Sequence, residues 1–335
     1  MATHESEWLN QAQRGDREAF GLLAERYRRE MHVHCYHMLG SLADADDAVQ
    51  EAFLRAWRGI DGFAGRSSFR SWLYSIATNA CLDALATRKR SLRTLPERLG
   101  PPSSEPPEGE TLREIRWLEP YPDAALERIA DASPEPEELH ETREAVELAF
   151  VAAVQHLPPR QRAVLLLRDV LQCSAAETAG MLDMTVASVN SALQRSRATT
   201  KAQSGPGARP ARPAPTAQQR KLIERYVRAW EHTDLDALVA LLREDAVLSM
   251  PPIPEWYCGV QAIRATLASV WTQLDGPFIL LPTSANGQPA FVHYAESADG
   301  SERHAHAVHV LTLDGAAIAA MTLFRDPHVV ERFAR

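Results

Sequence analysis

The clearest structural pattern in the chain is the segment Cys173-Ser-Ala-Ala-Glu-Thr-Ala-Gly-Met-Leu-Asp-Met-Thr-Val-Ala-Ser-Val-Asn-Ser-Ala-Leu-Gln-Arg-Ser-Arg197. Ser174 and Glu177 have the spacing of a capping box, in which two side chains satisfy backbone amides at the start of a helix. The apolar spacing then predicts a short helix to Leu182, a turn over residues 183–185 and a second helix. The segment is therefore predicted to be a helix-turn-helix.

The second of these helices has one apolar and one polar face. Val186, Val189 and Leu193 are predicted to face inward, which turns the polar residues toward solvent. Such side chains can reach base edges and phosphates in a major groove, and they are Ser188, Asn190, Ser191, Gln194, Arg195 and Arg197. A helical hairpin with a solvated face would show the same pattern, so the segment alone leaves that alternative open.

Length and composition limit the number of domains and the class of protein in which this motif can lie. At about 100–200 residues per domain, the 335 residues predict two or three domains. The chain is 45% hydrophobic and 24% charged, which is ordinary for a globular protein, and its net charge of -8 can hide local basic patches. No run approaches the ~18 apolar residues of a membrane span, and the start lacks a leader pattern. We expect a cytoplasmic protein without membrane contact.

Shifts in composition divide the chain into five parts. Residues 5–95 are predicted to form a helical domain that ends in a basic cluster, and residues 96–136 an acidic, Pro-rich linker. Residues 137–201 hold the helix-turn-helix, and residues 202–216 form a second linker. Residues 217–335 begin with one amphipathic helix and continue in alternating strands, which predicts an α+β domain with a curved antiparallel sheet.

Three local features refine this division. Val49, Phe53, Leu54 and Trp57 repeat as an apolar helix face, which Asp44 or Asp46 is expected to cap. The dipeptides Asn286-Gly287 and Asp314-Gly315 predict hairpin turns. The run Arg116-Trp-Leu-Glu-Pro-Tyr-Pro-Asp123 in the first linker is too aromatic for an inert spacer, so we expect it to dock on another part of the chain.

Three segments in order carry a resemblance to a known family. Leu157-Pro-Pro-Arg-Gln-Arg-Ala-Val-Leu-Leu-Leu-Arg-Asp169, with the hairpin after it, resembles region 4 of a group IV (extracytoplasmic-function, ECF) sigma-70 factor. Asp46-Asp-Ala-Val-Gln-Glu-Ala-Phe-Leu-Arg-Ala-Trp57 and Phe69-Arg-Ser-Trp-Leu-Tyr-Ser-Ile-Ala-Thr-Asn-Ala-Cys-Leu-Asp83 resemble region 2. The resemblance implies two all-α domains, a region 2 helical bundle and a region 4 helix-turn-helix, which bind RNA polymerase core and promoter DNA.

The resemblance also implies roles for individual residues. Asp47, Gln50 and Glu51 would contact the β′ clamp of polymerase core, and region 4 would meet the β flap. Asn79 matches the position that contacts a base of the opened −10 strand, Trp72 is a stacking or core residue, and the phosphate contacts would come from Arg66, Arg70, Arg88, Lys89 and Arg90. The polar face of the second hairpin helix would read the −35 duplex.

The C-terminal part carries a second resemblance. Leu222 to Pro251 and Gly259 to Arg264 resemble a SnoaL-like or NTF2-like cone-shaped domain, which places Tyr226, Trp230, Met250 and His309 around its interior. In ketosteroid isomerases of this fold Tyr226 matches a catalytic tyrosine, but Met250 stands where the general base belongs, and a thioether accepts no proton. We therefore expect no catalytic residue and no cofactor, and a regulatory domain that contacts the sigma domains. An NTF2-like enzyme or small-molecule-binding protein fused to a DNA-binding helix-turn-helix is the alternative.

The remaining histidines and cysteines are not spaced so that three or more of them would meet at one metal ion. His304, His306 and His309 lie on one predicted strand, where alternation puts the first two on one face and the third on the other. The four cysteines stand singly, without a Cys-x-x-Cys pair. No metal site is predicted.

Overall fold

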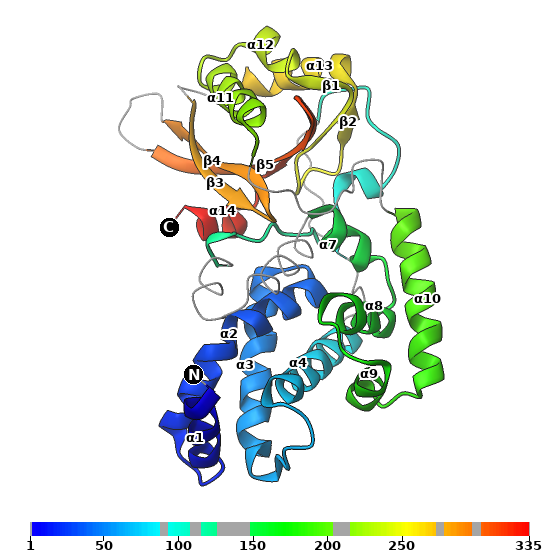
Figure 1. Ribbon diagram of the computed structural model, residues 1–335. Coiled ribbons are helices and arrows are strands. Elements are labelled where there is room, and N and C mark those ends of the chain that lie inside the picture. The colour runs from blue at the N-terminus through cyan, green and yellow to red at the C-terminus, as the bar shows by residue number, and fades with distance from the viewer. Residues whose placement is uncertain are drawn as a thin grey trace. The chain divides into compact units, whose positions relative to one another are not determined.

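A computed structural model of the chain describes residues 2–87, 93–107, 115–125, 148–203, 215–272, 278–296 and 303–334 (Figure 1). The chain divides into two compact units, each with its own core. The first, the helical unit, comprises Met1–Leu92, Ala125–Val146 and Phe150–Ser204. The second, the sheet unit, comprises Arg93–Ala124, Glu147–Ala149 and Gly205–Arg335. The ends of these two units differ from the boundaries of the five segments predicted from composition. The five-part division therefore stays a prediction.

The N-terminal half of the helical unit is a bundle of α1 (Ala2–Ala12), α2 (Arg17–Leu39), α3 (Leu42–Gly59) and α4 (Phe69–Ala86), with a 3-10 turn at Ile60–Gly62. Its core includes Leu23, Met31, Tyr36 and Leu73, all nearly inaccessible to solvent. Helix α2 ends at Gly40, whose positive φ of 69° is a conformation that glycine adopts without a steric cost.

The start of α3 differs from the sequence prediction. The cap is Ser41, which accepts a hydrogen bond from the Asp44 amide, so Asp44 and Asp46 lie inside the helix. The two acids were the wrong choice because the helix begins at Leu42, about two turns before the apolar repeat starts at Val49. Leu54 was also predicted to face inward but is 51% exposed.

The C-terminal half of the helical unit contains α7 (Leu148–Gln155), α8 (Pro159–Leu165), a π turn (Leu166–Val170), α9 (Ala175–Leu182) and α10 (Val186–Gln203). The capping box is confirmed, because the Ser174 amide donates to Glu177 Oε2 at 2.8 Å and the Glu177 amide to Ser174 Oγ at 3.2 Å. Val186 is 45% exposed rather than inward, since it is the first residue of α10 beside the turn.

The sheet unit holds a six-stranded sheet in the order β2-β1-β6-β5-β4-β3. The elements are α11 (Ala217–Glu231), α12 (Leu235–Val239), β1 (Leu242–Ser249), β2 (Trp256–Cys258), α13 (Val260–Trp271), β3 (Phe278–Ala285), β4 (Gln288–Glu296), β5 (Arg303–Asp314), β6 (Ala317–Phe324), α14 (Pro327–Phe333) and a 3-10 turn at Pro96–Arg98. Within this unit, α11, α12 and α13 lie on one side of the sheet and α14 on the other (Figure 1).

Two expectations for this unit need correction. The predicted single helix from residue 218 to 242 is two helices, because Thr233 has a φ of 50° and Asp234 caps α12 with its carboxylate. The sheet is mixed rather than antiparallel, since β1 and β6 run parallel. The hairpin turn between β3 and β4 is confirmed by the positive φ of Asn286 and Gly287. In the part of the chain that the structure describes, no helix is both long and apolar enough to cross a bilayer.

Candidate nucleic-acid and polymerase interfaces

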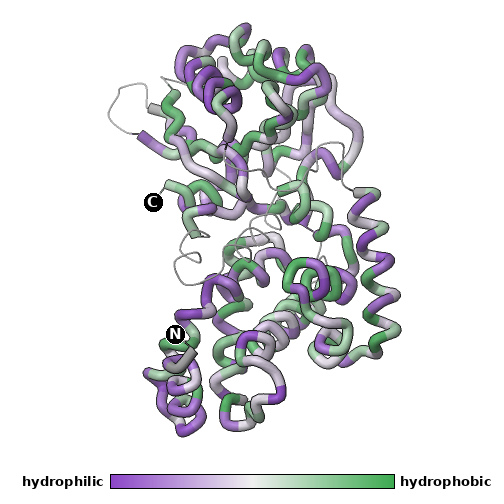
Figure 2. Tube along the Cα trace, viewed as in Figure 1, coloured by the Kyte–Doolittle hydropathy of each residue, from purple (hydrophilic) through white to green (hydrophobic). Residues whose placement is uncertain are grey.

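The outer face of α10 carries the residues expected to read duplex DNA. Val189, Ala192 and Leu193 are buried beneath it. Polar residues recur along the whole helix (Figure 2), and all six candidates are exposed: Ser188, Asn190, Ser191, Gln194, Arg195 and Arg197. Arg197 differs from the rest, because its guanidinium binds Asp169 through two contacts of 2.9 and 2.6 Å, and this carboxylate raises the pKa of Arg197. Its charge is therefore partly neutralised in the free chain.

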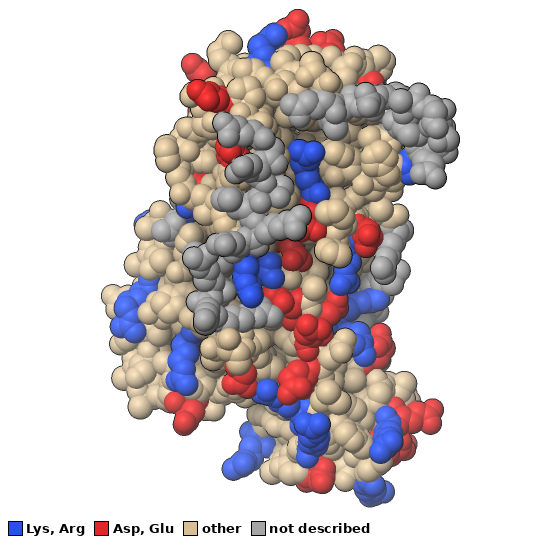
Figure 3. Space-filling model, turned by 180° about the vertical axis from the view of Figure 1, so that it is seen from behind, with Lys and Arg blue, Asp and Glu red and all other residues tan. Residues whose placement is uncertain are grey.

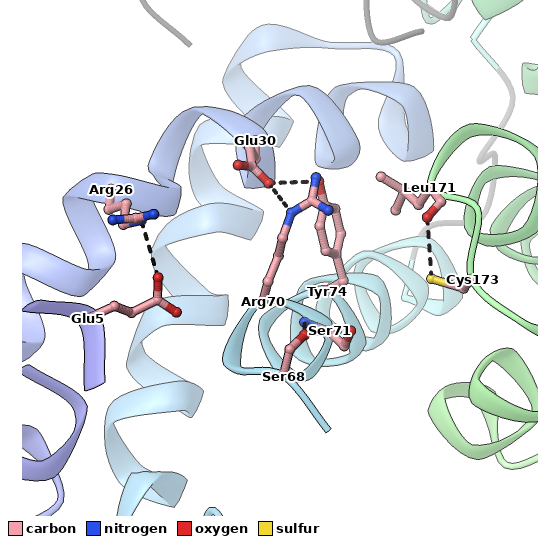
Figure 4. A network of polar contacts seen from close by, with 9 residues as sticks. All are labelled: Glu5, Arg26, Glu30, Ser68, Arg70, Ser71, Tyr74, Leu171 and Cys173. Atoms are coloured by element: carbon pink, nitrogen blue, oxygen red, sulfur yellow. Dashed lines mark hydrogen bonds and ion pairs between the residues drawn. The ribbon is translucent and has the colours of Figure 1, made fainter. Parts of the chain in front are cut away.

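The start of α4 holds the residues expected beside the opened strand. Arg66 is exposed in the loop before the helix. Arg70 Nε contacts Glu30 Oε2 at 2.7 Å, and its guanidinium lies 5.4 Å from the centre of the Tyr74 ring (Figure 4). The Tyr74 hydroxyl donates to the same carboxylate at 3.3 Å, and burial together with the charge of Glu30 raises the pKa of Tyr74. Arg70 is thus held in a network rather than projecting freely.

Trp72 belongs to an aromatic group at the same end of α4. Its ring centre lies 5.1 Å from that of Phe63 and 5.6 Å from that of Phe69. The side chain is half-buried, so it has both a packing contact and an exposed part. Arg88, Lys89 and Arg90, the other predicted phosphate contacts, lie outside the described residues.

Asn79 is engaged in the structure. Its Nδ2 donates to the Ser75 carbonyl at 2.9 Å, one turn earlier in α4, and to the Met181 carbonyl at 3.2 Å. Met181 lies in α9, so the proposed base-reading side chain contacts the first helix of the helix-turn-helix. In this arrangement the Nδ2 donor is engaged by the protein itself.

One face of α3 combines acidic, polar and apolar groups. Asp47 and Gln50 are exposed, and Glu51 is half-buried with Oε1 at 2.7 Å from Arg55 Nε. Leu54 follows Gln50 by one turn and Asp47 by two, so all three share this face. A single exposed leucine is ordinary on a protein surface, so this face is distinguished by its acidic and polar groups. The apolar pattern misassigned Leu54 to the core, although its spacing from Asp47 and Gln50 was visible in the sequence.

Charges of both signs cover the surface shown in Figure 3, where red and blue side chains intermingle. Basic groups of the helical unit are partly matched by acids, as Arg70 is by Glu30 and Arg55 by Asp83 at 2.6 Å. Local ion pairs therefore compensate part of the cationic charge that a nucleic acid would meet.

The predicted interior residues of the sheet unit come together. Tyr226 Oη and His309 Nδ1 share a hydrogen bond of 2.9 Å, and the centre of the Trp230 ring lies 4.7 Å from that of His309. Met250 is buried in the same apolar core cluster. Burial raises the pKa of Tyr226, so its hydroxyl keeps its proton.

A β-bulge changes the expected arrangement of histidines. Opposite Tyr294, strand β5 has an extra residue, because His293 pairs with Ala307 while Tyr294 pairs with Ala305. The extra residue is His306, whose ring centre lies 5.4 Å from that of His293, and His309 reaches the same ring at 5.0 Å. The prediction that His309 faces away from His306 was therefore wrong, since a bulge breaks strand alternation.

These imidazoles are uncharged at neutral pH. Burial lowers the pKa of His293 to about 3 and that of His306 to about 4, and it lowers the pKa of His309 well below its usual value. Nε2 of His293 and of His309 has no hydrogen-bond partner among the described residues. The described residues nevertheless contain no cluster of three or more side chains arranged to hold a metal ion.

The described parts of the first linker, with residues 93–95 just before it, form a segment of residues 93–107 and 115–125 that we call the linker strap. At one edge of the sheet, the Ser103 amide donates to the carbonyl of Trp256 in β2 at 2.7 Å. At the other edge, the Asn286 amide donates to the Tyr121 carbonyl at 2.9 Å, and the Asp123 amide donates to the carbonyl of Ser284 in β3 at 3.1 Å. The strap therefore bonds to both edge strands of the sheet.

Side chains reinforce this docking. Asp123 Oδ1 accepts a hydrogen bond from the Gly287 amide at 3.0 Å, in the turn between β3 and β4. Leu95, Leu118 and Tyr121 of the strap are buried. Thr94 joins the two parts of the strap through hydrogen bonds to both neighbours of Trp117. The expectation that the aromatic run docks is confirmed, and its docking site is the sheet unit.

Comparisons with known proteins agree with this architecture. Three families match in order: Sigma-70 region 2 at residues 23–91, Sigma-70 region 4 at 147–199 and the SnoaL-like domain at 223–321. The ECF RNA polymerase sigma factor SigG of Mycobacterium tuberculosis is 44% identical over 325 residues, which cover 96% of this chain and 84% of that protein. SigW of Bacillus subtilis, also an ECF RNA polymerase sigma factor, is 29% identical over 189 residues, 56% of this chain and 90% of SigW.

A solved structure shares the whole fold. The crystal structure of the Mycobacterium tuberculosis ECF sigma factor SigJ superposes with a TM-score of 0.60 at 18% identity, covering 93% of this chain and 98% of SigJ. Fold and surfaces together define a protein with two helical sigma modules followed by an α+β SnoaL-like domain. The chain belongs to the ECF family of RNA polymerase sigma factors.

Proposed function

We propose that this chain directs RNA polymerase core to promoters through three surfaces. The observation that carries the proposal is the exposed polar face of α10 on a capped helix-turn-helix in a chain of the ECF family. Gln194 and Arg195, with the other polar residues of this face, read the −35 duplex. Asn79 and the basic groups around α4 hold the −10 strand, and Asp47, Gln50, Glu51 and Leu54 bind the β′ clamp. Such a protein works in the cytoplasm, where the polymerase is.

Promoter-dependent run-off transcription tests this proposal. Core polymerase with the full chain should start transcripts at defined sites on genomic fragments, whereas core alone should not. Gln194→Ala with Arg195→Ala should weaken specific duplex binding by roughly 30-fold or more, because each of the two lost base contacts removes about 1–3 kcal/mol of discrimination.

The matched control for that experiment is Arg160→Ala, which removes one exposed arginine from α8 in the same module. Start sites and specific binding should persist in this variant. Random initiation by core with the wild-type chain would contradict the proposed function, and equal losses in the α10 variant and the control would contradict the role of α10.

We also propose that the SnoaL-like domain regulates the sigma modules by holding the linker between them. The support is the linker strap, which bonds to β2 and to the β3–β4 turn. In ECF sigma factors this linker connects the two promoter-reading modules, so a domain that binds it limits how far the modules can move relative to each other. Release of the strap would allow both to engage one promoter.

Weakening the strap should change exchange and activity together. Asp123→Ala removes the carboxylate that binds the Gly287 amide, a contact to a charged group worth about 1.5–3 kcal/mol. Backbone amide hydrogen exchange at Leu118 and Tyr121 should accelerate by roughly tenfold or more, and run-off yield should rise. Asp326→Ala is the matched control, because Asp326 is also an aspartate of the same domain that binds a backbone amide, that of His328 in α14. Unchanged exchange in Asp123→Ala would count against the strap.

The sheet unit is proposed to act without catalysis. The pair that resembles catalytic groups, Tyr226 and His309, is fully buried, and Met250 supplies no proton acceptor where the related isomerases carry their base. An enzyme fused to a helix-turn-helix would have no reason to co-purify with polymerase core. If the chain co-purifies stably with polymerase core, that result favours the sigma-factor function over the enzyme alternative.

A further inference from the structure

A long stretch without acidic residues joins the DNA-reading helix to the sheet unit. The whole chain has a net charge of -8, yet residues 184–223 hold seven Lys and Arg and no Asp or Glu. This stretch contains all of α10, the connection after it and the first half of α11. The average over the chain therefore hides a local cationic region of the kind that attracts polyanions.

Helix α11 continues this cationic region on its outer side. Lys221, Arg225 and Arg228 stand four and three residues apart, a spacing that places them in one row along a helix. All three are exposed, whereas Leu222 and Tyr226 on the opposite side are buried in the core of the sheet unit. We call Lys221, Arg225 and Arg228 the α11 stripe.

Acidic residues do not neutralise the α11 stripe. Within the described residues none of its three cations has an ion pair, and Glu224 and Glu231 on the adjoining side of α11 have none either. Other arginines of the sheet unit are paired, as Arg243 is with Asp314 at 2.9 Å. Like charges at these helical spacings repel each other, so the row becomes more favourable when an anion lies against it.

The rest of the same domain has the opposite charge. Residues 217–335 hold ten Lys and Arg against fourteen Asp and Glu, and three of the ten cations form the α11 stripe. A polyanion is therefore repelled by most of this domain and attracted along one helix. Such a contrast fixes the side on which a charged partner binds.

We propose that the α11 stripe binds the phosphate backbone of duplex DNA that flanks the −35 element. The proposal rests on the sigma-factor function above, and it adds a DNA-binding surface in the SnoaL-like domain. Gln203 ends α10 and Ala217 begins α11, so the connection between them spans at most about 50 Å when extended. One turn of duplex is about 34 Å long, so the stripe can reach the backbone within roughly one and a half turns of α10. These contacts add affinity without reading sequence.

The salt dependence of duplex binding tests this surface. Arg225→Gln with Arg228→Gln removes two charges from an exposed helix face, where substitutions rarely disturb the fold. Arg303→Gln with Arg332→Gln is the matched control, because it removes the same charge from exposed positions on β5 and α14 of the same domain. Each full-length chain is titrated against a fluorescein-labelled random duplex of about 30 base pairs, by fluorescence anisotropy, at about 50 to 200 mM salt.

The slope of log affinity against log salt reports the number of phosphates contacted, at about 0.9 per contact. The α11 double variant should bind more weakly than the wild type with a slope smaller by about 1.8, so its deficit should be roughly twelvefold larger at 50 mM than at 200 mM salt. The control variant should keep the wild-type slope. Circular dichroism should show both variants folded.

Two results would overturn the proposal. One is a wild-type slope in the α11 double variant, and the other is an equal loss of slope in the control. If the slope is unchanged but the α11 double variant binds polymerase core less tightly, the stripe contacts an acidic protein surface and the DNA assignment is wrong. In all of these cases start-site selection by the wild-type chain in run-off transcription would still support the sigma-factor function, so the two failures are distinguishable.

Discussion

At about pH 5 the sheet unit is expected to be at least ~2 kcal/mol less stable than at neutral pH, because its buried histidines resist protonation. Burial holds the pKa of His293 at about 3, whereas an unfolded histidine titrates near 6.5. As the pH falls below about 6.5 the unfolded state gains a proton that the folded state does not, so stability declines until the pH reaches the folded pKa. His309, whose pKa burial also lowers, adds a loss in the same direction.

Urea unfolding at neutral and acidic pH, followed by hydrogen exchange of the backbone amides in β4 and β5, measures this loss. His293→Phe should flatten the pH dependence by about 2 kcal/mol, since phenylalanine fills the site without a titratable group. His328→Phe is the control, because His328 is an exposed residue of the same unit. A pH dependence that His293→Phe leaves intact, or that both variants flatten equally, would contradict the assignment to the buried imidazole.

Features encoded by neighbouring residues were predictable from the sequence. Ser174 and Glu177 are three residues apart, so their capping box needs no tertiary contact. The Asn286-Gly287 turn is equally local, because both residues tolerate a positive φ. The order of the three domains followed from motifs of this local kind, and the family comparisons confirmed it.

Features that depend on distant residues were not predictable. The bulge at His306 arises from the register between β4 and β5, which strand alternation alone does not reveal. Asn79 was matched to a base-contacting position, but its contact with Met181 joins residues 102 positions apart. The linker run containing Trp117 showed by its composition that it docks, whereas the edge strand it binds depends on the sheet order. The proposed DNA and polymerase contacts stay predictions for the experiments above.

Arg162→Met is expected to destabilise the helical unit by about 3 kcal/mol. Replacing a buried charge with an apolar side chain recovers its desolvation cost, and such changes are neutral or stabilising when the partners are replaced too. Here the partners remain: the carbonyls of Met38, Gln155 and Leu157 would lose a donor in a buried site. Each unsatisfied buried acceptor costs about 1–3 kcal/mol, so three of them outweigh the recovered desolvation.

Arg160→Met provides the comparison, because Arg160 lies two residues earlier on α8 and is exposed. Surface substitutions of this kind usually change stability by less than about 0.5 kcal/mol. Urea unfolding followed by circular dichroism of the helices should separate the two variants by about 3 kcal/mol in the free energy of unfolding. A difference below about 1 kcal/mol would mean that water or another side chain replaces the guanidinium, since unsatisfied carbonyls alone exceed that value. In that case the carbonyls of Met38, Gln155 and Leu157 would not depend on Arg162 for their hydrogen bonds.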